Sequence, residues 1–172
     1  MGHKRKSIFE SVVDIKEIYN NANFLQQNVP VLHDLVKNNV ELIVVVKVNN
    51  YRYFSFKLLC KDLSSTPFFR YDSDGDAHRN YSPDIPLKEQ QITTPHFHKF
   101  NEKGVSFAYK TNIILNESER KALEDINLCI AFFCKESNIE PVKEDYPTIQ
   151  INSKELPLDF SCIDPLMNVK FQ

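Results

Sequence analysis

Two long apolar segments with only two asparagines between them constrain the fold of this chain more than any other feature. Residues 40–48 and 51–60 are rich in β-branched and aromatic side chains, which favour strands. Asn49 and Asn50 separate them, and asparagine tolerates the positive φ angles of a two-residue type I′ turn. The pattern predicts an antiparallel β-hairpin. Because both faces of the first strand are apolar, we expect a helix to cover at least one of them.

The remaining pattern predicts further strands and two flanking helical regions. Strands are expected at residues 66–72, 92–100 and 104–110, and a helix at 8–20, where apolar residues recur at helical spacing. Pro30 is expected to open a short helical turn. A second helix is expected from the N-cap Asn116 to just before Pro141.

These elements predict an α+β fold: a compact single domain whose antiparallel sheet of four to five strands is flanked by N-terminal and C-terminal helices. We expect residues 1–140 to form the core domain and residues 141–172 to form an extended C-terminal tail that packs on it. At 172 residues the chain is long enough for one such domain.

Composition limits the function classes. The formal net charge of −2 excludes strong attraction of the whole molecule to nucleic acid, so any such contact requires a local patch. The four cysteines show no C-x-x-C spacing and are expected to be buried free thiols. The sequence shows no signal-peptide pattern and no apolar run of membrane-spanning length, so we expect a soluble, cytoplasmic protein with no membrane partner.

The chemistry is expected in residues 66–100, which hold three of the five histidines. Side chains alternate between the two faces of a strand, so His96 and His98 should point to one face. Arg70 and Asp72 obey the same rule on an earlier strand. If the two strands are neighbours, these four side chains converge, and His78 can reach them from the polar loop at 73–91.

Such a cluster suits metal-independent RNA cleavage, because histidines can donate and accept protons while cationic side chains stabilise the phosphate. We expect His96 and His98 to be the acid–base pair, with His78 as the alternative acid and Asp72 as the residue that orients an imidazole. The predicted catalytic residues are His96, His98, His78 and Asp72, and the predicted RNA-binding residues are Arg70, Arg79, Lys99, Tyr71 and Tyr81.

Three other interpretations fit the same residues. His78, the His-x-His pair and Asp72 could bind zinc or iron, although neighbouring Arg and Lys side chains disfavour a cation. A non-enzymatic inhibitor could use its aromatic residues and long loop to bind a nuclease or an RNA-guided complex, as an anti-defence (anti-CRISPR-like) protein. The cluster could also be purely structural.

Several other sites are excluded by motif. Residues 72–76 contain three aspartates, but glycine falls at the fourth place of an EF-hand loop rather than the sixth. The sequence has no Walker or G-x-G-x-x-G motif, so no nucleotide cofactor is expected, and we expect no other cofactor or metal.

The site residues resemble those of a group of small bacterial proteins. Their signature is an aromatic or aliphatic pair, then Arg-Tyr-Asp or Arg-Leu-Asp, a histidine soon after, and Pro-His-x-His on a later strand. The matching segments here are 68–72, 77–80, 95–98 and 132–134. One branch comprises the TumE-type toxins of toxin–antitoxin modules, and another is an uncharacterised family of similar length. This chain departs from the latter after Asn80, where Tyr81 replaces the usual proline. The resemblance implies a toxin-like or mobile-element protein, with an antitoxin among its expected partners.

Overall fold

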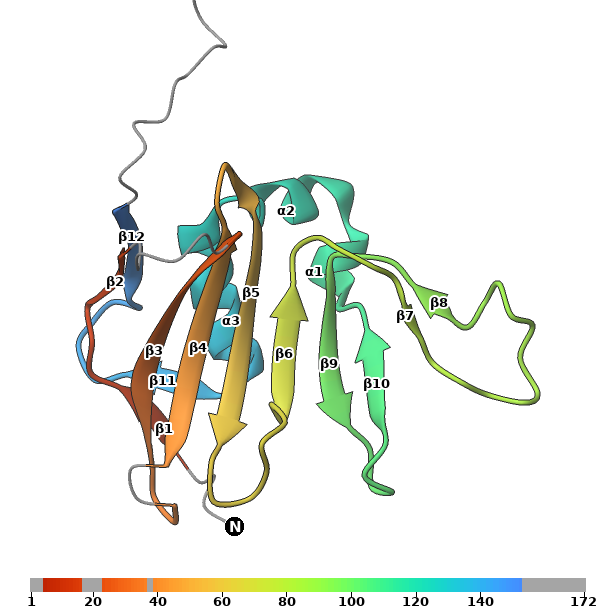
Figure 1. Cartoon of the computed structure of the whole chain (residues 1–172), viewed down its shortest axis with the longest axis horizontal. Coiled ribbons are helices and arrows are strands. Elements are labelled where there is room, and N and C mark those ends of the chain that lie inside the picture. Colours follow the sequence, from red (N-terminus) through yellow and green to blue (C-terminus); the bar gives the residue numbers. More distant parts are fainter. Residues whose placement is uncertain (1–4, 17–22, 37–38, 153–172) are drawn as a thin grey trace, which may run out of the picture.

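A curled, eight-stranded mixed sheet forms the body of the protein (Figure 1). The computed structural model describes residues 5–16, 23–36 and 39–152. Strands account for 44% of these described residues and helices for 15%, so the fold is mostly β. The strands are β1 (Lys6–Ile8), β2 (Val12–Lys16), β3 (Phe24–His33), β4 (Val40–Lys47), β5 (Asn50–Cys60), β6 (Phe69–Asp72), β7 (His78–Arg79), β8 (Gln91–Ile92), β9 (His96–Phe100), β10 (Ser106–Tyr109), β11 (Ile139–Pro141) and β12 (Thr148–Asn152). The helices are α1 (Asn112–Leu115), α2 (Glu117–Ala122) and α3 (Ile126–Glu136).

The strand order of the main sheet is β10-β9-β6-β5-β4-β3-β1-β11. All neighbouring pairs are antiparallel except β1 and β11, which are parallel. Two small sheets accompany it: β12 pairs with β2 in parallel, and β7 pairs with β8. This topology makes β6 and β9 neighbours, which brings the two polar strands of the sequence side by side.

The predicted hairpin is present as β4 and β5. Its turn differs from the predicted one: Lys47 pairs with Asn50, so the turn residues are Val48 and Asn49. Of these two only Asn49 has a positive φ, of 62°, so the turn is not the predicted type I′ turn. The predicted strands at 66–72, 92–100 and 104–110 correspond to the shorter strands β6, β9 and β10.

The predicted α+β fold class is wrong, because the described part of the chain is mostly β with only three short helices. In place of the predicted helix, Ile8 ends β1, residues 9–11 form a connection, and Val12–Lys16 form β2. Residues 17–20 of that predicted helix lie outside the described part of the chain. The helical turn expected at Pro30 is part of strand β3. The sheet has eight strands and is mixed, in place of four to five antiparallel strands between two helices.

Proline is tolerated in β3 because of where it lies. Pro30 pairs with Glu41 of β4, but on the other side of β3 the registered pairs with β1 involve only Leu32 and His33. The missing N–H of Pro30 therefore faces no registered partner, which is the position in which a sheet accepts proline.

Three short helices cover one face of the sheet, and Figure 1 shows α3 behind β4 and β5. The predicted helix after Asn116 is divided: Asn116 caps α2 and Asp125 caps α3, each accepting hydrogen bonds from backbone N–H groups. From α3, Phe133 packs against Phe56, Phe69 and Phe97 of three different strands. Aromatic side chains therefore fill the core between helix and sheet.

The segment 141–172 was expected to pack on the core as a tail. Its described part instead contributes to the main sheet and to the small β2–β12 sheet. Pro141 ends β11, and β12 pairs along its whole length with β2. Residues 153–172 lie outside the described part of the chain. The thiols of Cys60, Cys129 and Cys134 are free and buried, as expected for these three cysteines. Within the described ranges, no helix combines the length and apolar character needed to span a membrane.

Candidate functional site

The face of the sheet opposite the helices carries the polar side chains of the predicted site. The registers place them in two rows that cross several strands. In one row Lys57, Arg70 and His98 lie side by side, and in the other Ser55, Asp72 and His96 do. The convergence that strand alternation predicted is therefore present, and it involves β5 as well as β6 and β9.

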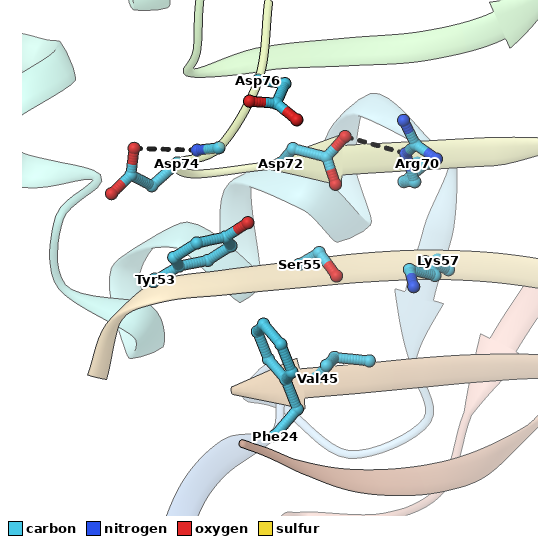
Figure 2. Close-up of a pocket in the computed structure, with 10 residues that line it drawn as sticks. Phe24, Val45, Tyr53, Ser55, Lys57, Arg70, Asp72, Asp74 and Asp76 are labelled. Carbon is cyan, nitrogen blue, oxygen red and sulfur yellow. Dashed lines mark hydrogen bonds and ion pairs between the residues drawn. The ribbon is translucent and has the colours of Figure 1, made fainter. Parts of the chain in front are cut away.

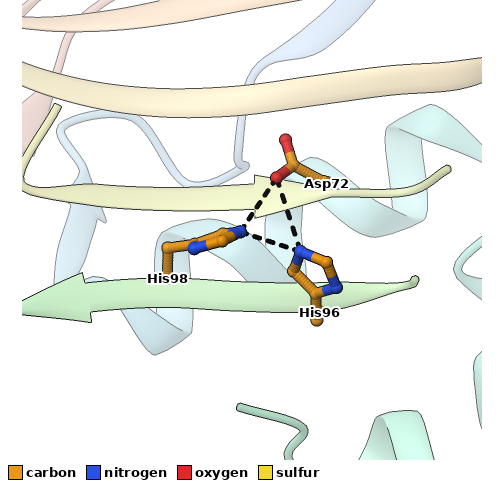
Figure 3. A group of neighbouring side chains, drawn as sticks. All are labelled: Asp72, His96 and His98. Atoms are coloured by element: carbon orange, nitrogen blue, oxygen red, sulfur yellow. Dashed lines mark hydrogen bonds and ion pairs between the residues drawn. The ribbon is translucent and has the colours of Figure 1, made fainter. Parts of the chain in front are cut away.

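Asp72, His96 and His98 meet at a single point between β6 and β9 (Figure 3). The two Nε2 atoms of the histidines lie 2.8 Å apart. The Asp72 Oδ2 atom lies 3.2 Å from Nε2 of His98 and 3.6 Å from Nε2 of His96. Arg70 completes the cluster, with Nη2 at 2.8 Å from His98 Nε2 and Nε at 2.8 Å from Asp72 Oδ2.

The Nε2 atom of His98 lies near more polar groups than it can hydrogen-bond at one time. A guanidinium group only donates, so Nε2 of His98 must offer its lone pair to Arg70. The same atom also lies at hydrogen-bonding distance from His96 Nε2 and beside the Asp72 carboxylate. An imidazole nitrogen has one lone pair in the ring plane, so it cannot satisfy these neighbours together. The Arg70 and His96 side chains therefore compete for the Nε2 lone pair of His98.

Burial and charge shape the protonation of the cluster. Burial alone would raise the pKa of Asp72, but its contacts with His96 and His98 and the charge of Arg70 outweigh burial and lower that pKa well below its usual range. Burial lowers the pKa of His78, and its electrostatic interactions with His98, His96 and Arg70 lower it further. Asp72 is therefore the fixed anion of the site.

A groove of about 340 Å³ runs along the open face beside the cluster. Figure 2 shows Lys57 and Arg70 toward one end of it and Asp74 and Asp76 toward the other. Phe24 and Val45 supply apolar lining. The full set of lining residues is Phe24, Val45, Tyr53, Ser55, Lys57, Arg70, Asp72, Asp74, Gly75 and Asp76. His98 and His96 are only 5% and 1% exposed, so access to the cluster is through Arg70 and Asp72.

The first part of the loop between β6 and β9, around His78 and Asn80, lies beside the cluster. The Asn80 side chain donates to the backbone oxygen of Ala108 and accepts from its N–H, which fastens the loop to β10. The ring of His78 lies edge-on to that of His98, with centroids 4.6 Å apart. His78 therefore belongs to the cluster, as predicted from its position on the loop.

Four of the predicted RNA-binding residues lie away from the cluster. Tyr71 points to the opposite face and is buried in the aromatic core, so it has no surface to offer RNA. Lys99 also lies on that face, with its Nζ 4.6 Å from the ring centroid of Tyr109. Arg79 and Tyr81 contact each other on the loop, where Arg79 also donates to the buried Gln90.

Lys57 and Ser55 are the site residues that sequence reasoning missed. Each lies on β5 directly opposite a predicted residue, Lys57 opposite Arg70 and Ser55 opposite Asp72. Their alternation on the strand was readable, but their register with β6 was not. Burial lowers the pKa of Lys57, while the carboxylate of Asp72 opposes that change.

No protein-family model matches this chain, and searches of curated proteins and of solved structures likewise found no match. The similarity to TumE-type toxins thus stays a prediction based on the motif.

Proposed function

We propose that this protein binds single-stranded RNA along the open face of its sheet and cleaves it at the cluster of Asp72, His96 and His98. The observation that carries the proposal is the position of His98, whose Nε2 contacts the Asp72 carboxylate and the Arg70 guanidinium, both of which line the groove. A proton-transfer group beside a phosphate-binding cation is the minimum that RNA cleavage through the 2′-hydroxyl requires.

The charges in the groove set the path of the RNA. Lys57 and Arg70 form its cationic end, and Asp74 and Asp76 would repel a phosphate at the other end. A phosphate is therefore expected over Arg70, next to His98. In this position the 2′-oxygen attacks phosphorus and loses its proton, and the 5′-oxygen leaves with a proton, giving a 2′,3′-cyclic phosphate.

The geometry revises the roles expected from sequence. His96 and His98 touch each other, so they cannot stand on opposite sides of one phosphorus atom as acid and base. We assign proton transfer to His98, with His78 as the second proton-transfer residue on the loop side. The nearly inaccessible His96, together with Asp72, holds His98 in place.

Cleavage of a labelled single-stranded RNA in EDTA tests the proposal. The wild-type protein is expected to release fragments that end in 2′,3′-cyclic phosphate, and DNA of the same sequence is expected to stay intact because it lacks the attacking hydroxyl. His98→Gln should slow cleavage by about 10²–10⁴-fold, the usual contribution of a proton-transfer group. His33→Ala removes a histidine of β3 far along the sheet order and serves as the control. Intact RNA after incubation with folded wild-type protein would refute the proposal.

The phosphate-binding role of Arg70 has its own test. Arg70→Gln is expected to weaken RNA binding and cleavage. The control is Arg52→Gln, which removes an exposed arginine paired with Glu124 on another part of the surface. Equal effects of the two substitutions would contradict the proposed position of the phosphate.

A second candidate function rests on a different observation. The loop around β7 and β8 projects from the sheet (Figure 1) and exposes the apolar side chains of Tyr81, Ile85 and Leu87. Exposed apolar residues on a projecting loop favour contact with another protein. Under this proposal the chain is a non-enzymatic inhibitor of a nuclease or RNA-guided complex, or a toxin held by an antitoxin. Co-purification of one defined partner with the wild-type chain, lost in Leu87→Asp, would support it.

A further inference from the structure

The centre of the Asp72–His96–His98 cluster has the geometry of a metal site. In a tetrahedral zinc site the ligand atoms lie about 2.0–2.1 Å from the ion and therefore ~3.3 Å from one another. The three atoms here are separated by 2.8, 3.2 and 3.6 Å. They come from two neighbouring strands at registered positions. Asp72 lies opposite His96, and His98 lies two residues further along the same strand as His96.

The cation that contacts two of the donor atoms in this structure is Arg70, whose Nη2 lies 2.8 Å from His98 Nε2 and whose Nε lies 2.8 Å from Asp72 Oδ2. Two imidazole nitrogens and a carboxylate oxygen face one point, all within 4.8 Å of one another. The histidine side chains are nearly inaccessible to solvent, so water cannot satisfy both nitrogens. A divalent ion would accept all three lone pairs at once, provided that the Arg70 side chain moves aside.

We propose that Asp72, His96 and His98 form a binding site for Zn²⁺, through Oδ2 and the two Nε2 atoms, and that bound zinc inhibits the RNA cleavage proposed above. Two nitrogens and one oxygen suit zinc, and three protein ligands leave a fourth position open toward the groove. Zinc binding stands independently of the cleavage activity. Its inhibitory effect rests on the proposed function, because zinc would occupy the Nε2 lone pair of His98 that proton transfer uses.

The positive charge of Arg70 is expected to weaken zinc binding, which determines the expected effect of removing it. Its Nη2 atom lies 2.8 Å from His98 Nε2, close to the open ligand position. The Arg70 side chain is 38% exposed, so it can move toward solvent when zinc enters, although its charge still repels the ion. Arg70→Gln is therefore expected to tighten zinc binding about tenfold, whereas it weakens RNA binding.

His96 limits the affinity. Its Nδ1 atom is buried and has no hydrogen-bond partner among the described residues. Zinc-binding histidines ordinarily donate this second N–H, and loss of such a partner costs about 10–100-fold in affinity. We therefore expect micromolar rather than nanomolar binding.

The test uses the full-length protein freed of metal with EDTA and then dialysed. Zn²⁺ is titrated against a chromophoric chelator, and Co²⁺ is added separately to record the visible absorption of a tetrahedral site. The wild-type chain should bind one ion. Asp72→Asn and His98→Gln keep the size of each side chain and should each lower the affinity at least about tenfold. Far-UV circular dichroism confirms that each variant is folded.

Matched controls separate this site from other histidines. All proteins carry His3→Ala, because that histidine lies outside the described residues, and His33→Ala in this background should bind zinc like the parent. No binding by the folded parent, or equal binding by the parent, Asp72→Asn and His98→Gln, would overturn the zinc site. Weaker rather than tighter binding by Arg70→Gln would overturn the assigned ligand geometry.

The inhibitory effect is tested separately, by adding Zn²⁺ to the RNA-cleavage reaction. Suppression of cleavage at the zinc concentration that fills the site supports it. Unchanged or faster cleavage with the site filled would overturn inhibition while leaving the binding result intact. A protein that binds zinc and cleaves no RNA under any condition refutes the proposed function, and the chelator titration still decides the site.

Discussion

The alternation of strand β9 can be tested by truncating Phe97, the residue between the two site histidines. Phe97 is fully buried and contacts five aromatic rings, at centroid distances of 4.9–6.3 Å. Replacing a buried phenylalanine by alanine costs about 3–5 kcal/mol, which combines the lost transfer free energy with the cavity left behind. Phe97 lies at the centre of the aromatic core, so we expect the upper part of this range.

Urea unfolding followed by far-UV circular dichroism measures this cost. Phe97→Ala should lower the free energy of unfolding by about 3–5 kcal/mol, and the melting temperature by roughly 6–20 °C for a chain of this length. The control is Phe100→Ala in the same strand, where the side chain is 39% exposed and the cost should stay below about 1 kcal/mol.

The outcome bears directly on the site. A strand that buries Phe97 on the helix side must direct His96 and His98 to the opposite face. If Phe97→Ala were no more destabilising than Phe100→Ala, Phe97 would not be in the core. The two histidines would then not share the open face, and the proposed cluster would lose its basis.

Three further predictions concern other parts of the fold. Ionised Asp72 stabilises the folded protein because folding lowers its pKa, so in EDTA the stability advantage of wild type over Asp72→Asn should be full at neutral pH. That advantage should shrink as the pH falls below the usual carboxyl range; a constant difference in unfolding free energy down to strongly acidic pH would contradict it. Asn116→Ala removes the cap of α2 and should cost about 0.5–2 kcal/mol in urea unfolding; no loss would mean that the cap is dispensable. Gly75→Ala should cost about 1–3 kcal/mol, because φ there is 120° and a Cβ would lie 2.8 Å from the Tyr53 hydroxyl. Gly104→Ala, with φ of 73° and open space around it, is the milder control, and equal melting temperatures for the two variants would refute the steric argument.

The sequence alone was sufficient to predict those features for which one local signal was strong. The asparagine pair marked the β4–β5 hairpin, and the period of two placed His96 and His98 on one face with Arg70 and Asp72 facing them. The same period excluded Tyr71 and Lys99 from that face, because each immediately follows a residue that points toward it. Those two residues were therefore assigned to RNA binding against information that the sequence already contained.

The N-terminal strands could not be predicted locally. Residues 8–16 satisfy helical spacing at Ile8, Val12 and Ile15, but they also alternate, with Val13 and Ile15 buried. Their β-branched side chains favour a strand only when a partner is present, and the partner of β2 is β12, more than a hundred residues further along the chain. Tertiary pairing therefore outweighed the helical pattern.

The sequence by itself thus determined which side chains share a face, because alternation is a property of each strand alone. Only the tertiary structure decided which strands are neighbours. That decision placed Lys57 beside Arg70, brought three ligand atoms to one point and closed the loop of His78 over them. The physical reason is that register between strands depends on how the whole chain buries its apolar surface, and no short segment contains that information.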